Sequence, residues 1–252
     1  MITNIGKYFI KYCVITGGIF ILFLKILKNL HKTDYKQTVS NLYSTGINSL
    51  PIVFMTAIFV GAIMVIQTGF YVREFQMNDI LGWGVGFFSF REISPLMIGL
   101  MVSGRIGANT TAEIGNMKIN EQIDMLKSFS INPVQYIVVP KFVSIVVMMC
   151  VLVVLGDFIT ILTGIAAGNI LLNIDSHIFL SSFFAYIKNI DFIIGVVKAA
   201  VFGVIISVIS CYFGLNVGNT SRSIGKNVSK SVIFIASSIF IIDYFLTSLF
   251  EL

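Results

Sequence analysis

The chain has 252 residues, of which 56% are hydrophobic and 12% are charged. Soluble domains carry about 25% charged residues, so the composition excludes an ordinary soluble protein and predicts an all-α integral membrane protein. The formal charge of +5 is typical of a membrane protein with basic cytoplasmic loops, and nucleic acid is not an expected partner.

The residues that usually carry catalysis or bind metals are few and scattered. Cys13, Cys150 and Cys211 lie in apolar runs without ligand spacing, so we interpret them as small buried hydrophobic residues. His31 and His177 are too few for a histidine-based metal site or triad. P-loop, G-x-S-x-G and H-E-x-x-H motifs are all missing. We therefore predict that this chain is not an enzyme and has no catalytic residues, metal or cofactor.

Residues 1–49 form a basic N-terminal region around the apolar run Tyr12–Leu24. The run resembles the core of a signal peptide, but no small-x-small cleavage site follows it. Its 13 residues are fewer than the roughly 20 that span a bilayer. We interpret it as an interfacial helix whose lysines face anionic headgroups on the cytoplasmic side. The alternative is a sixth spanning helix. The lysines are Lys7, Lys11, Lys25, Lys28, Lys32 and Lys36.

Four later stretches are each expected to cross the bilayer once. Leu50–Phe70 has 21 residues without a charge, and Phe142–Ile174 has 33 residues with one charge. The other two are Ala199–Leu215 and Ser231–Phe250. With an irregular fifth span in residues 80–104, they predict about five transmembrane helices.

Charged residues mark the ends and interruptions of these spans. Asp157 is expected near the far interface if its span begins at Lys141, and we interpret it as an interfacial carboxylate rather than a functional site. Asp243 interrupts the last span. Residues 175–198, which end in Lys198, predict a short amphipathic helix on the far surface.

The irregular span consists of two apolar pieces, Ile80–Phe90 and Ile93–Gly104, separated by Arg91–Glu92 and followed closely by Pro95. Neither piece is long enough to span alone, so we expect either a break or bend here or a first piece that is re-entrant or interfacial. A central charge costs about 2.5–3.5 kcal/mol to insert, so the charged pair must be satisfied by other groups. One interpretation is a polar lining of a substrate cavity, and the other is a snorkelling pair at a helix end.

Arg91 and Glu92 cannot face each other on one helix, because helical neighbours diverge by about 100°. At least one of them needs water, a lipid headgroup, or a charge on another element such as residues 1–49. A lipid phosphate suits the planar fork of Arg91, and a lysine suits Glu92.

Small residues recur at four-residue spacing after this pair, as Ser103 and Gly107 and as Gly104, Ala108 and Ala112. This pattern allows close helix packing, either within the chain or against a second copy.

Residues 111–128 are polar and helical in pattern between long apolar runs. Thr110 and Glu113 fit a capping box, and Asn120 could cap a second turn. The segment exceeds the usual connection of roughly 2–8 residues between bundle helices. We therefore interpret it as an amphipathic docking helix on the membrane face, with a mere linker as the alternative.

Basic residues orient the chain. They gather in the N-terminal region, in residues 105–141 and in residues 216–230. The positive-inside rule places these three segments in the cytoplasm, with the C-terminus outside. The docking helix therefore faces the cytoplasm.

Several motifs together resemble the Mla-type (MlaE-like) permeases of ABC lipid transporters, from about residue 45 to the end. They are R-E-I-S-P-L (91–96), G-R-I-G-A (104–108), A-E-I-G-N-M-K (112–118), E-Q-I-D-M-L (121–126), N-P-V-Q-Y-I-V-V-P-K (132–141), S-I-G-K-N-V-S-K-S-V (223–232) and D-Y-F-L-T (243–247). Ser94 departs from the family's usual glycine, and Asn109–Thr110 from small apolar residues. The 216–224 loop is shorter and has fewer glycines. These departures could alter local packing.

The resemblance implies a permease transmembrane domain over residues 50–252 and a cytoplasmic coupling helix at about 111–128. It further implies a homodimer bound to an ATP-binding ABC subunit, with an MCE-domain lipid-binding protein on the far side. Such a complex moves phospholipid between the inner membrane and an outer compartment. Arg91 and Glu92 match the family's charged pair beside the lipid cavity. The residues matching its coupling helix are Glu113, Gly115, Met117, Glu121 and Asp124.

The alternative functions are a self-contained channel or ion-driven carrier and, third, a membrane-embedded lipid enzyme. The enzyme is disfavoured because no nucleophile–base pair is evident. The residue usage, rich in Ile, Lys, Asn and Phe, indicates an AT-rich genome and favours a bacterial inner membrane over a plastid envelope.

Overall fold

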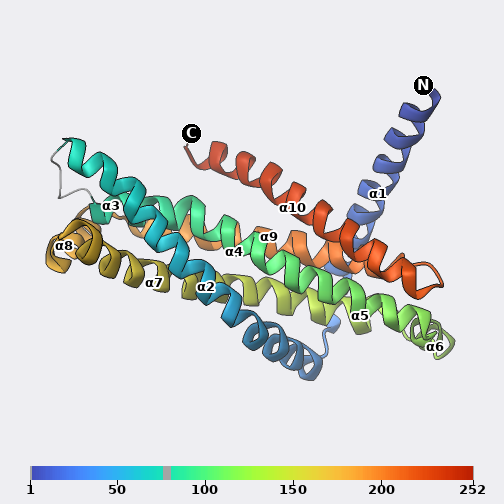
Figure 1. Cartoon of the computed structure of the whole chain (residues 1–252). Coiled ribbons are helices and arrows are strands. Elements are labelled where there is room, and N and C mark those ends of the chain that lie inside the picture. The colour runs from blue at the N-terminus through green and yellow to red at the C-terminus, as the bar shows by residue number, and fades with distance from the viewer. Residues whose placement is uncertain (1, 76–80, 252) are drawn as a thin grey trace.

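The computed structural model describes residues 2–75 and 81–251, and all its regular elements are helices, which confirms the all-α membrane fold (Figure 1). The helices are α1 (Ile2–Asn29), α2 (Tyr35–Phe75), α3 (Leu81–Phe88), α4 (Ser94–Val102), α5 (Ala108–Ile119), α6 (Gln122–Ser128), α7 (Val139–Leu172), α8 (Ser176–Tyr186), α9 (Asn189–Leu215) and α10 (Ser221–Glu251).

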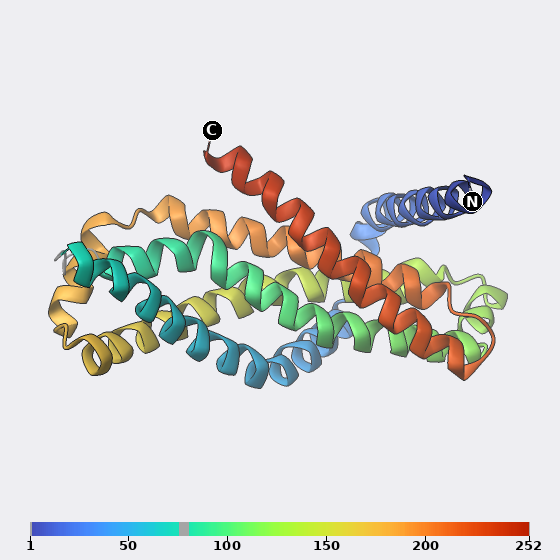
Figure 2. The same ribbon diagram turned by 45° about the horizontal axis from the view of Figure 1, so that its top comes forward.

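The helices form one elongated bundle. Figures 1 and 2 show α3 and α8 at one end and α6 at the other, while α2, α7 and α9 run lengthwise between them. In both views α10 crosses the bundle obliquely. By length and apolar composition, six helical stretches of the described chain could cross a membrane. The protein is therefore a multi-pass membrane protein.

Helix α7 shows how the apolar sequence is used. Its 34 residues give a length of about 51 Å, more than the roughly 30 Å of a bilayer core. Met149 and Leu152 are buried between neighbouring helices, whereas Val151 and Leu155 are exposed. A helix that is apolar on all sides can pack one side on protein and present the other to lipid. The single span expected for Phe142–Ile174 is confirmed.

The irregular span is one helical path from Leu81 to Ile119 and not two separate pieces. A π-helical turn, Ser89–Ile93, carries Arg91 and Glu92. Pro95 has no N–H to donate to the carbonyl of Arg91, so the wider turn accommodates the missing bond. A second π-helical turn covers Ser103–Gly107. The expected break is thus a local widening within a continuous span.

This span continues into the predicted docking region, and the capping box predicted at Thr110 does not form. Thr110 lies buried inside α5 without capping, because the helix has already begun in the membrane. The chain breaks instead at Asn120, which makes no side-chain cap, and Glu121, whose φ of 59° is left-handed. Short α6 follows.

Helix α1 leaves the bundle crosswise to its long axis, as Figure 1 shows. Leu22 and Ile26 anchor its second half in an apolar cluster with α5, α7 and α9. Lys25 and Lys28 are exposed, and the side chains of Lys7, Lys11 and Lys32 lie outside the described ones. The crosswise course fits an interfacial helix, while Tyr12–Asn29 is long and apolar enough to span. Both placements stay predictions.

Several predicted boundaries shift in the second half of the chain. The short helix expected within residues 175–198 is present as α8, but α9 begins at Asn189 and α10 at Ser221. Each span thus starts ten residues before its predicted start. The charged residues in these added helical turns either are buried among other helices or lie on the surface of the bundle, so each helix continues through them.

Two predicted environments are wrong. Asp157 is not interfacial: it lies in the middle of α7 with 2% exposure. The hydroxyl of Ser94 on α4 lies beside it, yet neither Asp157 Oδ1 nor Ser94 Oγ makes a hydrogen bond of standard geometry. Among the cysteines, Cys211 is buried as predicted and Cys150 half-buried, but Cys13 is exposed, because it lies on the part of α1 that leaves the bundle.

Candidate functional site

The strongest polar feature among the spans is a charge cluster centred on Lys198, which has no exposed side-chain surface. Its Nζ donates to Glu92 Oε1 at 2.6 Å and to Thr247 Oγ1 at 2.8 Å. Thr247 Oγ1 lies 3.1 Å from both carboxylate oxygens of Glu92. A third group, Asp243 Oδ1, lies 3.2 Å from Lys198 Nζ without hydrogen-bond geometry. The π-helical turn, α9 and α10 are thereby tied together.

Burial explains why Lys198 has more than one anionic neighbour. A charge removed from water is costly, and a nearby opposite charge with hydrogen bonds offsets that cost. Lys198 lies nine residues after the start of α9, which is about 14 Å along a helix and near half the thickness of a bilayer core.

Arg91 faces a different set of partners. Its Nε lies 3.8 Å from Asp191 Oδ1, and its Nη2 donates to the carbonyl of Phe250 at 3.4 Å. Its guanidinium also lies 5.0 Å from the ring centre of Phe87. Asp191 in turn accepts a bond from the backbone N–H of Lys188 at the start of α9. These long contacts hold Arg91 loosely compared with Lys198.

The five charged groups carry two positive and three negative formal charges, a net of −1: Arg91, Lys198, Glu92, Asp191 and Asp243. Glu92 keeps 30% of its side chain exposed. The cluster is therefore reachable from outside the protein.

The sequence predicts that at least one of Arg91 and Glu92 has a partner elsewhere, and in the structure each has a charged partner on another element, a lysine in the case of Glu92. The described part of residues 1–49 supplies none of them; they come from α9 and α10. Asp191, Lys198, Asp243 and Thr247 were not among the predicted site residues. The available signal was the spacing of Asp191 and Lys198, seven residues apart and so on one face of a helix.

The residues matching the coupling helix occupy different environments. Glu113 is paired with Lys141 at 2.7 Å and points into the bundle. Gly115 is buried, and a Cβ there would lie 2.9 Å from Val217 in the α9–α10 connection. Met117 is half-buried against an apolar cluster. These three residues therefore contact the protein's own helices.

Glu121 and Asp124, by contrast, are exposed at the α6 end. Lys127 lies 2.7 Å from Asp124, and its hydrogen bond and charge lower the pKa of that carboxyl. An apolar pocket of about 270 Å³ lies next to them, lined in part by Met125 and Phe129. Acidic groups beside an apolar pocket are suited to contact a soluble protein.

Within the described residues, no group of three or more His, Cys, Asp or Glu side chains is placed to hold a metal ion. The clustered charges are arranged to pair with one another or with a charged ligand.

Known proteins are similar in sequence to this chain over nearly its whole length. Residues 38–249 match the family model described as Permease MlaE. A probable ABC transporter permease protein of Rickettsia typhi is 36% identical over 97% of this chain and 95% of its own length. A protein of Arabidopsis thaliana, TRIGALACTOSYLDIACYLGLYCEROL 1, chloroplastic, is 30% identical over 90% of this chain and 64% of its own length. This chain belongs to the MlaE permease family.

Proposed function

We propose that the chain is the transmembrane permease subunit of an ABC-type transporter that moves phospholipid between a bacterial inner membrane and the outer compartment. The observation that carries the proposal is the Lys198 cluster, which gathers buried but reachable charges among long apolar helices. A zwitterionic or anionic headgroup needs such groups to enter a hydrocarbon environment. The lipid in the printed name of the Arabidopsis relative supports a lipid cargo.

Arg91 is the group proposed to bind the lipid phosphate. Its contacts with Asp191 and Phe250 are long, so a phosphate offering two oxygens can compete for the guanidinium. Glu92 and Lys198, held at 2.6 Å, keep the π-helical turn against α9 while Arg91 changes partner.

Energy is proposed to come from a separate ATP-binding subunit, as the printed names of the bacterial relatives imply for those proteins. It would dock on Glu121 and Asp124 and the adjoining apolar pocket. This places the α6 end and the N-terminus in the cytoplasm, in agreement with the positive-inside rule.

Two further partners complete the proposed complex: a second copy of the chain, and an MCE-domain lipid-binding protein on the far side. Helix α10 supports the homodimer, because it leaves a row of large apolar side chains uncovered. These are Phe240, Ile241, Tyr244, Phe245 and Leu249.

The test is ATP-driven transfer of a fluorescent phospholipid between proteoliposomes and acceptor vesicles. Arg91→Ala and Lys198→Met should each lower transfer at least about tenfold, because each removes a charge-assisted contact. Lys188→Met, at an exposed lysine just before α9, is the control and should transfer normally. Normal transfer by both cluster variants, with normal assembly, would remove the cluster from the lipid path.

One observation favours the runner-up, an ion-driven carrier: Asp157 is buried in the middle of α7 without a hydrogen bond to one of its oxygens. Gentle solubilisation separates the two functions. A stoichiometric ATP-binding subunit in the purified complex supports the permease, whereas an active oligomer of this chain alone supports the carrier.

A further inference from the structure

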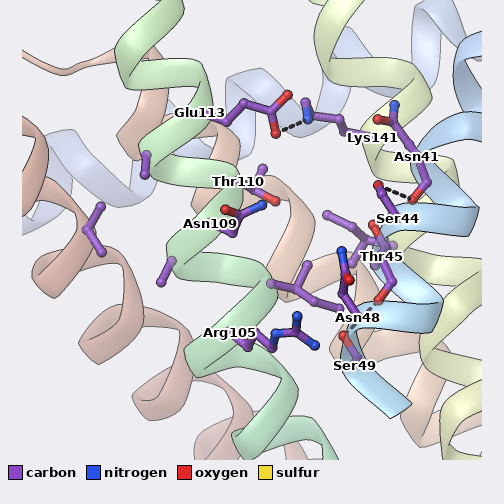
Figure 3. A pocket seen from close by; sticks show the side chains of 15 residues that line it. Asn41, Ser44, Thr45, Asn48, Ser49, Arg105, Asn109, Thr110, Glu113 and Lys141 are labelled. Atoms are coloured by element: carbon purple, nitrogen blue, oxygen red, sulfur yellow. Dashed lines mark hydrogen bonds and ion pairs between the residues drawn. The ribbon is translucent and has the colours of Figure 1, made fainter. Parts of the chain in front are cut away.

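A polar cavity of about 480 Å³ lies away from the Lys198 cluster, between α2, α5 and α7 (Figure 3). Its volume falls in the range of roughly 300–1,000 Å³ typical of small-molecule sites. We call it the Arg105 pocket, defined by Asn41, Thr45, Asn48, Arg105, Asn109 and Glu113.

The α2 wall of the Arg105 pocket is a polar stripe in the first half of that helix. Its members recur at helical spacing: Asn41, Ser44, Thr45, Asn48 and Ser49. The hydroxyls of Ser44 and Ser49 bond to carbonyls of their own helix. The side-chain amide of Asn48 makes no hydrogen bond within the described chain, and neither does that of Asn109 opposite. Amides left open towards a cavity can bind a polar ligand.

Arg105 extends into the pocket from the second π-helical turn. It is half-buried and has neither an ion pair nor a hydrogen bond among the described residues. The other pocket cation, Lys141, is neutralised by Glu113 at 2.7 Å. The lining therefore carries a net charge of +1, and that charge is on Arg105. A half-buried arginine without a counter-charge favours binding of an anion.

Small residues leave the space that the pocket occupies. Of the predicted small stripe, Ala108 and Ala112 line the pocket, and a Cβ added at Gly104 would meet no atom within 4 Å. Gly107 instead faces α10, where a Cβ would lie 2.8 Å from Ile235. One face of the span is thus closely packed while the other stays open.

We propose that the Arg105 pocket binds the phosphate of a phospholipid headgroup at the α5–α6 side of the membrane. A phosphodiester carries one negative charge and several acceptor oxygens, which match one guanidinium and two open amides. Arg105 lies 13 residues after Glu92 on the same span, about 20 Å along a helix. The pocket is therefore a second phosphate site, separate in depth from the Lys198 cluster.

The position on α2 favours a lipid over a soluble phosphate compound. Tyr43, Ile47 and Leu50 are exposed on the face of α2 opposite the polar stripe, so the helix that lines the pocket presents apolar surface to acyl chains on its other side.

The test is photolabelling of the chain in complex with its ATP-binding partner, in phosphatidylglycerol nanodiscs. The probe is a phosphatidylethanolamine with a diazirine in its headgroup, and labelled peptides are found by mass spectrometry. We expect labels in residues 41–49 and 105–113. Arg105→Gln should lower this labelling about tenfold, and Arg105→Lys should lower it less. The matched control is Arg222→Gln, an exposed basic residue at the same end of the bundle, which should label normally.

Two further arms identify the ligand. A diacylglycerol probe without phosphate should label the pocket poorly, and millimolar inorganic phosphate should not compete. Competition by inorganic phosphate would replace the lipid with a soluble ligand, and equal labelling by diacylglycerol would overturn the phosphate site. If Arg105→Gln does not fold, Asn48→Leu and Asn109→Leu test the same wall, and unchanged labelling in both would also overturn it.

The inference rests on the proposed function only in taking phospholipid as the ligand, and labelling requires neither ATP nor transfer. Arg105-dependent labelling in a complex that transfers no phospholipid would keep the pocket and refute the function. Normal transfer with labelling unchanged in Arg105→Gln would refute the pocket alone.

Discussion

Replacing Glu92 by glutamine should destabilise the protein through Lys198. The substitution keeps the size of the side chain but removes the carboxylate that lies 2.6 Å from the buried ammonium. Removing one partner of a buried ion pair costs about 3–5 kcal/mol, because the other charge stays buried. Lys198 retains Asp243 at 3.2 Å, so we expect the lower end, about 3 kcal/mol.

A comparison of variants isolates this charge effect. Asp243→Asn should cost less than Glu92→Gln, because Lys198 then keeps its shorter, hydrogen-bonded partner. Lys198→Met removes the charge that requires compensation. The double variant Glu92→Gln/Lys198→Met should therefore be more stable than the sum of its two single variants predicts.

The assay is thermal unfolding of the detergent-solubilised protein, followed by its single tryptophan, Trp83. A loss of about 3 kcal/mol corresponds to a midpoint lower by about 6–12 °C for a chain of this size. Lys188→Met should leave the midpoint unchanged. Strict additivity of the Glu92 and Lys198 substitutions would refute the ion-pair reasoning, whatever the size of the single effects.

Three further predictions concern docking, topology and packing. The double variant Glu121→Lys/Asp124→Lys should abolish co-purification of the ATP-binding subunit while the permease still inserts, since both side chains are exposed. Full retention of that subunit would contradict the docking surface. In a cysteine-free background, a cysteine at Ser223 should react with an impermeant thiol reagent only from the cytoplasmic side, and a cysteine at Ser176 only from outside. The reverse result would invert the proposed topology. Gly115→Val should lower the unfolding midpoint by several degrees, because its Cβ would lie 2.9 Å from Val217. A Cβ at Gly225 would meet nothing within 4 Å, so the control Gly225→Val should be near neutral. Equal midpoints for the two variants would contradict the close packing at Gly115.

Local sequence determined the helices of this protein. Long apolar runs predict membrane helices because each residue's transfer into lipid is nearly independent of its distant neighbours. The same local reasoning shows that at least one of Arg91 and Glu92 needs a partner on another element or outside the protein, since their directions on a helix are fixed by its period. It also places α7 as one span. The motifs that resemble the MlaE family are likewise a property of the sequence alone, and the family match confirms them.

The positions at which helices begin near charged residues depend on the tertiary structure. Lys198 was predicted to precede its span because an isolated lysine is costly in lipid. In the folded chain Glu92, 106 residues away, removes that cost, and the helix begins earlier. Asp157 was predicted at an interface for the same reason, yet it is buried beside α4.

The candidate sites also arise from tertiary contacts. Lys198, Asp243 and Thr247 converge on Glu92 only when α9 and α10 pack against the π-helical turn. The Arg105 pocket exists because a polar stripe of α2 faces small residues of α5 across a gap. Sequence periodicity tells which residues share one face of a helix, but which faces meet is decided by packing of the whole bundle, because side-chain shape and charge must match across helices distant in the chain.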